Sequence, residues 1–246
     1  MEQGNLNVNA RALTMIAHKL RTPLSIITGY CEAIEAQNKN ALSPFARKAL
    51  DEITVQGSYL SKLIDKLIAF NKACAATKET LQKQEITLKT LIKDCAARAL
   101  AQEENLPADK SSPDTTRRGA FVETDCSAQL TLKANEELLR LCIEELLENA
   151  IKFNQKTEKI IKVQCVNHGN CISIAVRDYG VGIRPQDVNR IFEPFYQVDD
   201  DLTGQVSGWG LGLTLVKLIL ELHDGSVSVV SDRGLGSIFT INLPLV

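Results

Sequence analysis

The chain has 246 residues and a formal net charge of -2, with 44% hydrophobic and 24% charged residues. This composition is typical of a globular protein with one large domain or two modest ones, and the near-zero charge argues against a general nucleic-acid-binding protein. No apolar segment approaches the roughly 20 residues of a membrane span, and no signal-peptide pattern opens the chain. The seven cysteines include no CxxC pair, so we expect reduced thiols and a cytoplasmic protein.

The first predicted element is a long helix from about residue 6 to about residue 36. His18 follows a core position of this helix, so we expect it on the outer side, where a neutral imidazole is a competent nucleophile. Pro23 cannot donate an N–H to the Lys19 carbonyl, which predicts a bend beside His18. A surface histidine with an incidental proline is the alternative interpretation. The core positions recur in steps of four and three, as in a coiled coil: Leu6, Ala10, Leu13, Ala17, Leu20, Leu24, Ile27, Cys31 and Ile34.

A second helix with the same heptad pattern is predicted after a break at residues 38–40. Ser43 is a typical N-cap and Pro44 a typical first helical residue. A hairpin of two such helices leaves half of its apolar surface exposed, so we expect two copies to pair into a four-helix bundle, with residues 5–76 as the dimerisation unit. Gln56 is the one polar residue at the predicted core positions, which are Ala49, Ile53, Gln56, Leu60, Leu63, Leu67, Phe70 and Cys74.

The remainder of the chain has a mixed α/β pattern. Residues 77–83 form a polar linker, and residues 84–246 are predicted to form an α/β sandwich, with one sheet and helices on one of its faces. We expect residues 107–118 to form a solvated loop, because they contain two prolines and no large apolar side chain. The predicted helices are 88–104, 135–153 and 211–222, and the predicted strands are 85–88, 120–124, 129–132, 160–166, 171–177, 226–231 and 237–243.

The predicted helix over 135–153 carries the first polar cluster with a possible chemical role. Glu145, Asn149 and Lys152 are spaced so that they share one helix face. A side-chain carbonyl such as that of Asn149 suits Mg²⁺, and Lys152 can offset phosphate charge. Taken alone, this cluster is better explained as the solvent-exposed face of an amphipathic helix.

A second cluster, with the pattern DxGxG, follows the strand at 171–177. Asp178 can accept a hydrogen bond from an amino group such as that of adenine, and Gly180 and Gly182 allow the backbone to approach a flat ligand. The apolar segment 191–196 could anchor one end of a lid over residues 197–207. The glycine-rich segment 208–213 opens the last helix, where free N–H groups favour phosphates.

Together these patterns resemble the two-component sensor histidine kinases. The sequence His-x-Leu-Arg-Thr-Pro-Leu at residues 18–24 is similar to the phosphoacceptor box of that family. The asparagine helix, DxGxG, Phe-Glu-Pro-Phe and GxGLGL, in this order, resemble the N, G1, F and G2 boxes of its ATP domain, which belongs to the gyrase, chaperone and mismatch-repair ATPase superfamily. Residues 234–237 resemble the last glycine box, and the resemblance covers residues 6–245.

The resemblance implies a homodimer that moves a phosphoryl group from ATP to His18 and then to an aspartate on the receiver domain of a response regulator. It also implies that Mg²⁺ accompanies ATP and that Asn149 is the metal ligand. The implied catalytic residues are His18, Lys19, Thr22 and Glu145. The implied nucleotide-binding residues are Asn149, Lys152, Phe153, Asp178, Gly180, Gly182, Ile183, Phe195, Gly208, Gly210, Leu211, Gly212 and Leu213.

Two residues depart from the family pattern. Lys19 stands where the family has an acidic residue, which in bifunctional members forms a water-positioning pair with a residue at the position of Thr22. Glu145 stands where such kinases often have Asn, and a glutamate at this spacing activates water in the hydrolysing members of the superfamily. A hydrolytic ATPase and a binding-only dimeric scaffold are therefore the alternatives to a kinase.

Overall fold

The computed structural model describes residues 2–38, 42–104, 119–198 and 210–245, with the side chains of 2–16, 18, 37, 38 and 104 outside that description. The chain forms two compact units, Met1–Ala75 and Ala76–Val246. The predicted loop over 107–118, Gly208 and most of the predicted lid lie outside the described residues. Residues 39 and 40 of the expected break at 38–40 also lie outside the described residues.

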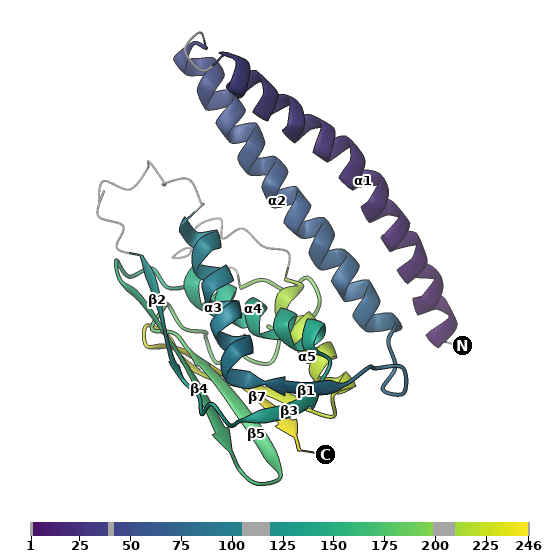
Figure 1. The fold of residues 1–246 in the computed structure, drawn as a ribbon, viewed down its shortest axis with the longest axis vertical. Helices are drawn as coiled ribbons and strands as arrows, with labels where there is room; N and C mark the ends of the chain where they lie inside the picture. The colour runs from purple at the N-terminus through teal and green to yellow at the C-terminus, as the bar shows by residue number, and fades with distance from the viewer. Residues whose placement is uncertain (1, 39–41, 105–118, 199–209, 246) are drawn as a thin grey trace. The chain divides into compact units, whose positions relative to one another are not determined.

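The first unit is an antiparallel pair of helices, α1 (Glu2–Asn38) and α2 (Pro44–Ala75) (Figure 1). Ser43 begins α2 as predicted, because its Oγ accepts a hydrogen bond from the Ala46 N–H at 3.2 Å. The interface between the helices contains residues spaced by seven along each helix. On α1 these are Ala17, Leu24 and Cys31, and on α2 they are Gly57, Ile64 and Asn71.

The predicted core positions of α2 are only partly buried within this single hairpin. Gln56 is exposed and donates a hydrogen bond to Glu52 at 3.1 Å, so it is not part of the contact between α1 and α2. Ile53 and Leu60 are also exposed, because the line that is buried between the two helices lies four positions further along, at Gly57 and Ile64. A heptad pattern identifies two apolar lines on a helix, and a single partner helix can cover only one of them.

The second unit contains two sheets, whereas the sequence predicted one. β1 (Gln84–Thr87) pairs with β3 (Thr131–Ala134) in a separate two-stranded antiparallel sheet. The larger sheet has the order β2 (Ala120–Asp125), β4 (Lys159–Asn167), β5 (Cys171–Arg177), β7 (Gly236–Pro244) and β6 (Ser226–Asp232). Only the β2–β4 pair is parallel in this larger sheet.

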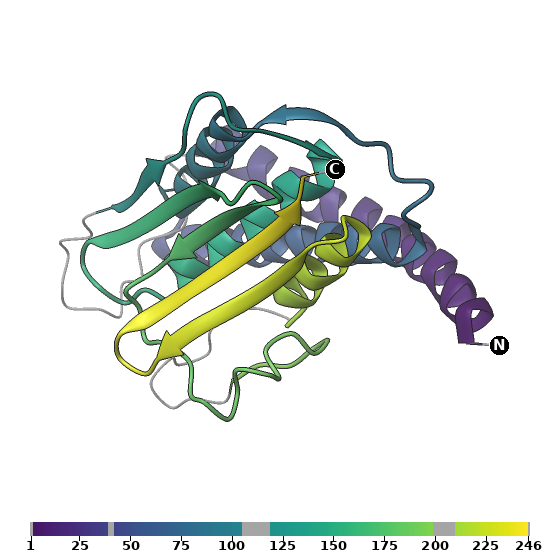
Figure 2. The ribbon, with the colours of Figure 1, turned by 90° about the horizontal axis from the view of Figure 1, so that it is seen from below.

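Three helices lie on one face of the five-stranded sheet, as Figures 1 and 2 show: α3 (Leu88–Glu104), α4 (Glu136–Lys152) and α5 (Gly212–Leu222). The strands alternate in burial, so one set of side chains faces the helices and the other faces away. The core between the layers is formed by fully buried side chains that include Ile161, Ile172, Ile174 and Ile241 from the sheet and Leu139, Ile143, Leu146, Leu147, Leu215 and Ile219 from the helices.

The N-terminus of α4 is fixed by two hydrogen bonds that join it to other elements. The Asn135 side chain caps the helix by accepting from the Leu138 N–H at 3.0 Å. The Asn135 N–H donates to Nε2 of buried His223, whose Nδ1 lies 2.7 Å from the Ile219 carbonyl. Burial lowers the pKa of His223, and the neutral ring joins the end of α5 to the start of α4.

The hairpin carries a second apolar line along each of its two helices. Leu20, Ile27 and Ile34 on α1 and Ile53 and Leu60 on α2 are exposed at heptad spacing. Since an exposed apolar line of this length is typical of a helix-bundle interface, we expect a second copy to bury it.

We predict that the chain is a dimer and that Ile27→Asp shifts it to a monomer, because the carboxylate would be buried in the interface without a partner. Ile26→Asp is the matched control, since Ile26 is 54% exposed, against 50% for Ile27, and lies off the heptad line. Sedimentation velocity at tens of micromolar measures the oligomeric state of the wild type and of both variants. A wild-type monomer at tens of micromolar, or equal effects of the two substitutions, would contradict this prediction.

Candidate nucleotide-binding site

The C-terminal end of α4 brings three of the predicted residues together. Asn149 is half-buried on the last turn of the helix, and Phe153 is the C-cap residue, whose N–H donates to the Asn149 carbonyl at 3.0 Å. Lys152 is exposed, and its ammonium group lies 4.9 Å from the centre of the Phe153 ring. An amide oxygen, a cation and an aromatic ring are thus available at one helix end.

Asp178 occupies the junction between β5 and β7. Its side chain is almost completely buried, and its Oδ1 accepts hydrogen bonds from the Gly180 N–H at 2.8 Å and the Ser237 N–H at 3.2 Å. Its own N–H donates to the Ser237 carbonyl at 2.9 Å. Burial raises the pKa of Asp178, and the two N–H groups oppose that shift because they stabilise the carboxylate.

The turn after Asp178 packs directly on the backbone of other segments. A Cβ at Gly180 would lie 2.3 Å from the Phe153 carbonyl oxygen, and one at Gly182 would lie 2.0 Å from the carbonyl oxygen of Asp232. Gly182 also has a φ of +68°, a conformation that disfavours other residues. The Val181 N–H donates to the Phe153 carbonyl at 3.2 Å. The DxGxG turn is therefore fixed against both the end of α4 and the β6–β7 hairpin.

The segment after Ile183 is held by a buried carboxylate that the sequence did not single out. Asp187 accepts hydrogen bonds from the Tyr196 hydroxyl at 2.7 Å and from Nε of Arg184 at 2.6 Å, and these two bonds lower the pKa of Asp187. The Arg190 guanidinium lies 4.2 Å from the centre of the Tyr196 ring. The segment is thus anchored on its own side chains.

Phe195 lies at the end of this segment. Its side chain is 61% exposed and its φ is +64°. Its N–H donates to the Gly210 carbonyl at 2.9 Å, which joins the Phe-Glu-Pro-Phe segment to the residues that precede α5. The two predicted ends of the lid therefore meet at this hydrogen bond.

The N-terminus of α5 lies against α4. Leu211 is its N-cap residue and provides no side-chain cap, and the first turn contains no acidic residue. Glu145, which is 3% exposed, reaches this turn from α4, so that a Cβ at Gly212 would lie 2.3 Å from its Oε2. Leu213 follows within the same turn. Two residues that sequence reasoning assigned separately, Glu145 and Gly212, are thus in contact.

Two family models match the chain. The His Kinase A (phospho-acceptor) domain matches residues 8–74, and the histidine kinase-, DNA gyrase B- and HSP90-like ATPase matches residues 134–246. The chain belongs to the two-component histidine kinases. In this histidine kinase core, the helical hairpin is the phosphoacceptor-type domain and the α/β sandwich is the ATPase-type domain, as the sequence predicted.

Curated relatives are consistent with this assignment. The chain is 31% identical to the autoinducer 2 sensor kinase/phosphatase LuxQ of Vibrio cholerae, over 99% of the chain and 27% of that protein. It is 30% identical to the sensor histidine kinase RcsC of Salmonella typhimurium, over 95% of the chain and 23% of that protein. The chain thus spans about a quarter of the length of these relatives.

Solved structures share the fold. The crystal structure of full-length ShkA in complex with AMPPNP has a TM-score of 0.72 and 24% identity to this chain. The match covers 95% of this chain and 45% of the ShkA chain. The histidine kinase AdeS of Acinetobacter baumannii has a TM-score of 0.54 and 18% identity, over 93% of this chain and 98% of that chain.

The predicted catalytic residues of the hairpin lie on one stretch of α1. Lys19 and Thr22 are exposed, and the side chain of His18 lies outside the described residues. Arg21 forms an ion pair with Asp65, which links this stretch to α2.

Among the helices that the structure describes, none has the length and hydropathy of a membrane span.

Sequence reasoning did not assign Ser237 to the site. Its N–H is one of the two donors to Asp178, and its carbonyl accepts from the Asp178 N–H. The resemblance of residues 234–237 to the last glycine box was the available signal, but it implied no role for Ser237.

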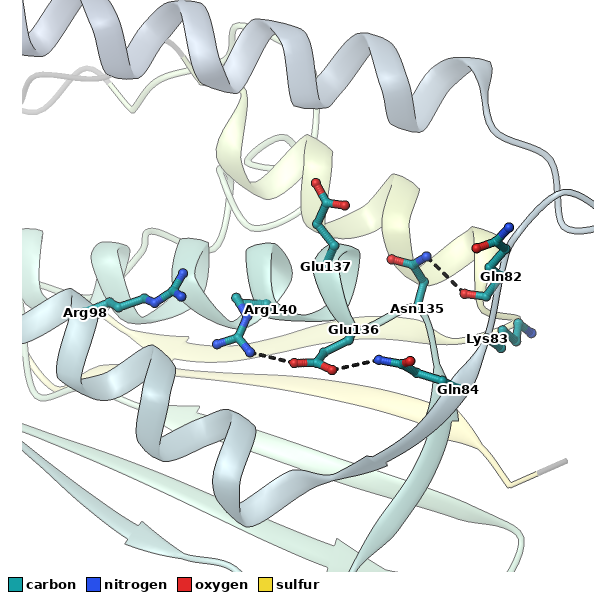
Figure 3. Close-up of a pocket in the computed structure, with 8 residues that line it drawn as sticks. All are labelled: Gln82, Lys83, Gln84, Arg98, Asn135, Glu136, Glu137 and Arg140. Atoms are coloured by element: carbon teal, nitrogen blue, oxygen red, sulfur yellow. Dashed lines mark hydrogen bonds and ion pairs between the residues drawn. The ribbon is translucent and has the colours of Figure 1, made fainter.

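A pocket lies at the opposite end of α4 from the predicted nucleotide residues (Figure 3). Glu136 accepts from Arg140 Nη2 at 2.7 Å and from Gln84 Nε2 at 2.8 Å, and Asn135 Nδ2 donates to the Gln82 carbonyl at 3.0 Å. About 13 Å of helix separates Arg140 from Asn149. These bonds attach the segment before β1 to α4, so we interpret the pocket as a structural junction.

We predict that Asp178→Asn weakens ATP binding roughly tenfold or more while the fold is kept. The Asn side chain retains an oxygen for the Gly180 and Ser237 N–H groups, but it loses the charge and replaces an acceptor with a donor. Losing a charged partner of this kind costs about 1.5–3 kcal/mol. Titration calorimetry measures the affinity, and Asp224→Asn is the control because Asp224 instead pairs with Lys78. An unchanged affinity in Asp178→Asn would remove Asp178 from the site.

Proposed function

We propose that this chain transfers the γ-phosphoryl group of ATP to His18 and then to an aspartate on a response-regulator receiver domain, as a homodimer. The observation that carries the ATP half of the proposal is the buried Asp178 carboxylate, oriented by the Gly180 and Ser237 N–H groups. The match of residues 8–74 to a phospho-acceptor domain supports His18 as the acceptor.

The residues of the site fit an adenine nucleotide. The Asp178 carboxylate can accept a hydrogen bond from the adenine amino group, and the absence of a side chain at Gly180 lets the turn that carries Asp178 pack against the Phe153 carbonyl. The N-terminus of α5 offers N–H groups to the phosphates. Ile183 follows the DxGxG turn, and its N–H donates to Ser231 Oγ at 2.8 Å, which fixes the floor of the turn.

Mg²⁺ fits the side chains around the phosphate positions. No group of three or more His, Cys, Asp or Glu side chains in the described residues could hold a metal ion by itself. Mg²⁺ takes few protein ligands when it binds with phosphates, so the Asn149 oxygen suffices as the protein ligand. Mg²⁺ supplies charge neutralisation on the phosphates when it is bound. Lys152 adds a second positive charge from the same helix end.

In the transfer step, a neutral His18 nitrogen attacks the γ-phosphorus. The N–P bond forms, the bond from the γ-phosphorus to the β–γ bridging oxygen breaks, and ADP leaves with that electron pair. The imidazole must also lose a proton. Lys19 is exposed and its ammonium group has no lone pair to accept that proton, so this chain lacks the neighbouring acidic group that could receive it.

Hydrolysis of ATP is the second candidate function. It is favoured by the buried Glu145 carboxylate, which lies one helical turn before Asn149 and against Gly212. A carboxylate in this position could activate water in place of the His18 nucleophile. The two functions differ in the destination of the γ-phosphoryl group.

We predict slow autophosphorylation at His18 and a gain of at least about tenfold with Lys19→Glu, because general-base help is typically worth about 10²–10⁴-fold. The assay follows the initial rate of acid-labile protein labelling from γ-labelled ATP, with free phosphate measured in parallel. Lys48→Glu on α2 is the control for the change of charge, since Lys48 is also exposed.

His18→Gln should abolish the label. Free phosphate without labelled protein would favour the ATPase, and neither product would favour a binding-only scaffold. If Lys19→Glu is no faster than wild type while His18→Gln is inactive, the kinase assignment stands and the role given to position 19 is wrong.

A further inference from the structure

We propose that Cys126 and Cys165 form a pair of thiols that a peroxide oxidises to a disulfide, which would join the end of β2 to β4. Both residues are free cysteines in the structure. Neither is among the residues that the sequence assigned to the nucleotide site. The inference therefore adds a modification site to the ATPase-type domain, and it does not depend on where ATP binds.

The pairing of two parallel strands brings these thiols side by side. Asp125, the last residue of β2, pairs with Gln164 on β4, so the next position in register places Cys126 beside Cys165. Adjacent strands lie about 4.8 Å apart, which falls within the Cα separation of about 4.4–6.8 Å that is usual for a disulfide. The strand pairing thus meets the main geometric condition for this bond.

The two thiols also face the same side of the sheet. Thr124 pairs with Val163, whose buried side chain lies on the face that the helices cover. Cys126 and Cys165 each follow two positions further along, and side chains two positions apart share a face. A hydrogen bond joins the two thiol side chains. The Cys126 S–H in turn donates to the Ser127 carbonyl at 3.8 Å.

The surroundings of the pair determine which thiol reacts first and how fast. Cys165 is half-buried, whereas Cys126 is only 8% exposed, so peroxide reaches Cys165 first. Burial raises the pKa of the Cys165 thiol, and its hydrogen bond with Cys126 adds to this shift. Because the thiolate is the reactive form, oxidation should be slow at neutral pH and faster in alkaline buffer.

Oxidation consumes one peroxide molecule and both thiols. The Cys165 thiolate attacks one peroxide oxygen, the O–O bond breaks, and a sulfenic acid and one water form. The Cys126 sulfur then attacks the sulfenic sulfur. The S–S bond forms, the S–O bond breaks, and a second water leaves with the remaining thiol proton. Both sulfurs are oxidised and the peroxide is reduced to water.

The disulfide would close a loop over residues 126–165, which includes β3, α4 and the first part of β4. A cross-link over a long loop restricts the unfolded chain more than the folded one, so it should stabilise the domain. The loop contains the helix end that carries Asn149 and Phe153. Oxidation should therefore make the part of the domain that contains these residues more resistant to unfolding.

The test exposes the full chain to hydrogen peroxide and identifies disulfide-linked peptides by mass spectrometry, with dithiothreitol added afterwards to check that the link is reversible. All samples carry Cys74→Ser, because exposed Cys74 can link two copies. Cys126→Ala and Cys165→Ala each remove one thiol of the pair. Cys171→Ala is the matched control, because it removes a half-buried thiol from β5, where Cys171 pairs with Pro244 rather than with another cysteine.

We expect one linked peptide pair that contains Cys126 and Cys165, and a midpoint of thermal unfolding that rises by at least about 5 °C on oxidation. Cys171→Ala should behave in the same way. In Cys126→Ala the sulfenic acid at Cys165 should persist and react with dimedone, and the midpoint should not rise.

The absence of this linked pair from the oxidised chain would overturn the proposal, even if no variant folds. An equal rise of the midpoint in Cys126→Ala would also overturn it, because the stabilisation would then come from another modification.

Discussion

The pair of hydrogen bonds from the Gly180 and Ser237 N–H groups to Asp178 holds the proposed nucleotide site together. These bonds stabilise a buried carboxylate and at the same time fix the turn after β5 to the start of β7. The same turn is attached to the end of α4 through the Val181 N–H and the Phe153 carbonyl. Because three elements converge on one turn, the orientation of Asp178 depends on backbone groups rather than on mobile side chains.

Helix α4 links this site to the rest of its unit. Its C-terminal end carries Asn149, Lys152 and Phe153, and its N-terminal end is attached through Asn135 to His223 and to the segment before β1. Its middle carries Glu145, which contacts the first turn of α5. One helix thus presents the predicted metal ligand and contacts α5, while its buried face packs on the sheet.

Much of this could be predicted from the sequence because its signals are local. Heptad spacing, the Ser43–Pro44 helix start and alternating apolar residues depend on short-range periodicity, and the structure contains the corresponding helices and strands. The order of the glycine boxes identified the family, which the matches of both domains confirmed. The roles of individual site residues stay predictions, because they depend on ligands and on the chemistry of the reaction.

The rest depends on contacts between distant segments, which periodicity does not reveal. The separate β1–β3 sheet, the contact of Glu145 with Gly212 and the Ser237 N–H bond to Asp178 each join residues far apart in the chain. The line of α2 that faces α1 was also not predictable, since a heptad pattern does not say which of two apolar lines faces the partner helix. In each case the local pattern was correct and the tertiary partner was missing.

We propose that adenine binds at the Asp178 turn and not in the pocket at the other end of α4. Amide chemical shifts of the ¹⁵N-labelled chain during titration with Mg-ATP test this claim most directly. We expect the amide resonances of Gly180 and Ser237 to shift. The amide resonances of Gln84 and Arg98, which line the pocket, should not change. Shifts at Gln84 and Arg98 with unchanged Gly180 and Ser237 resonances would contradict it.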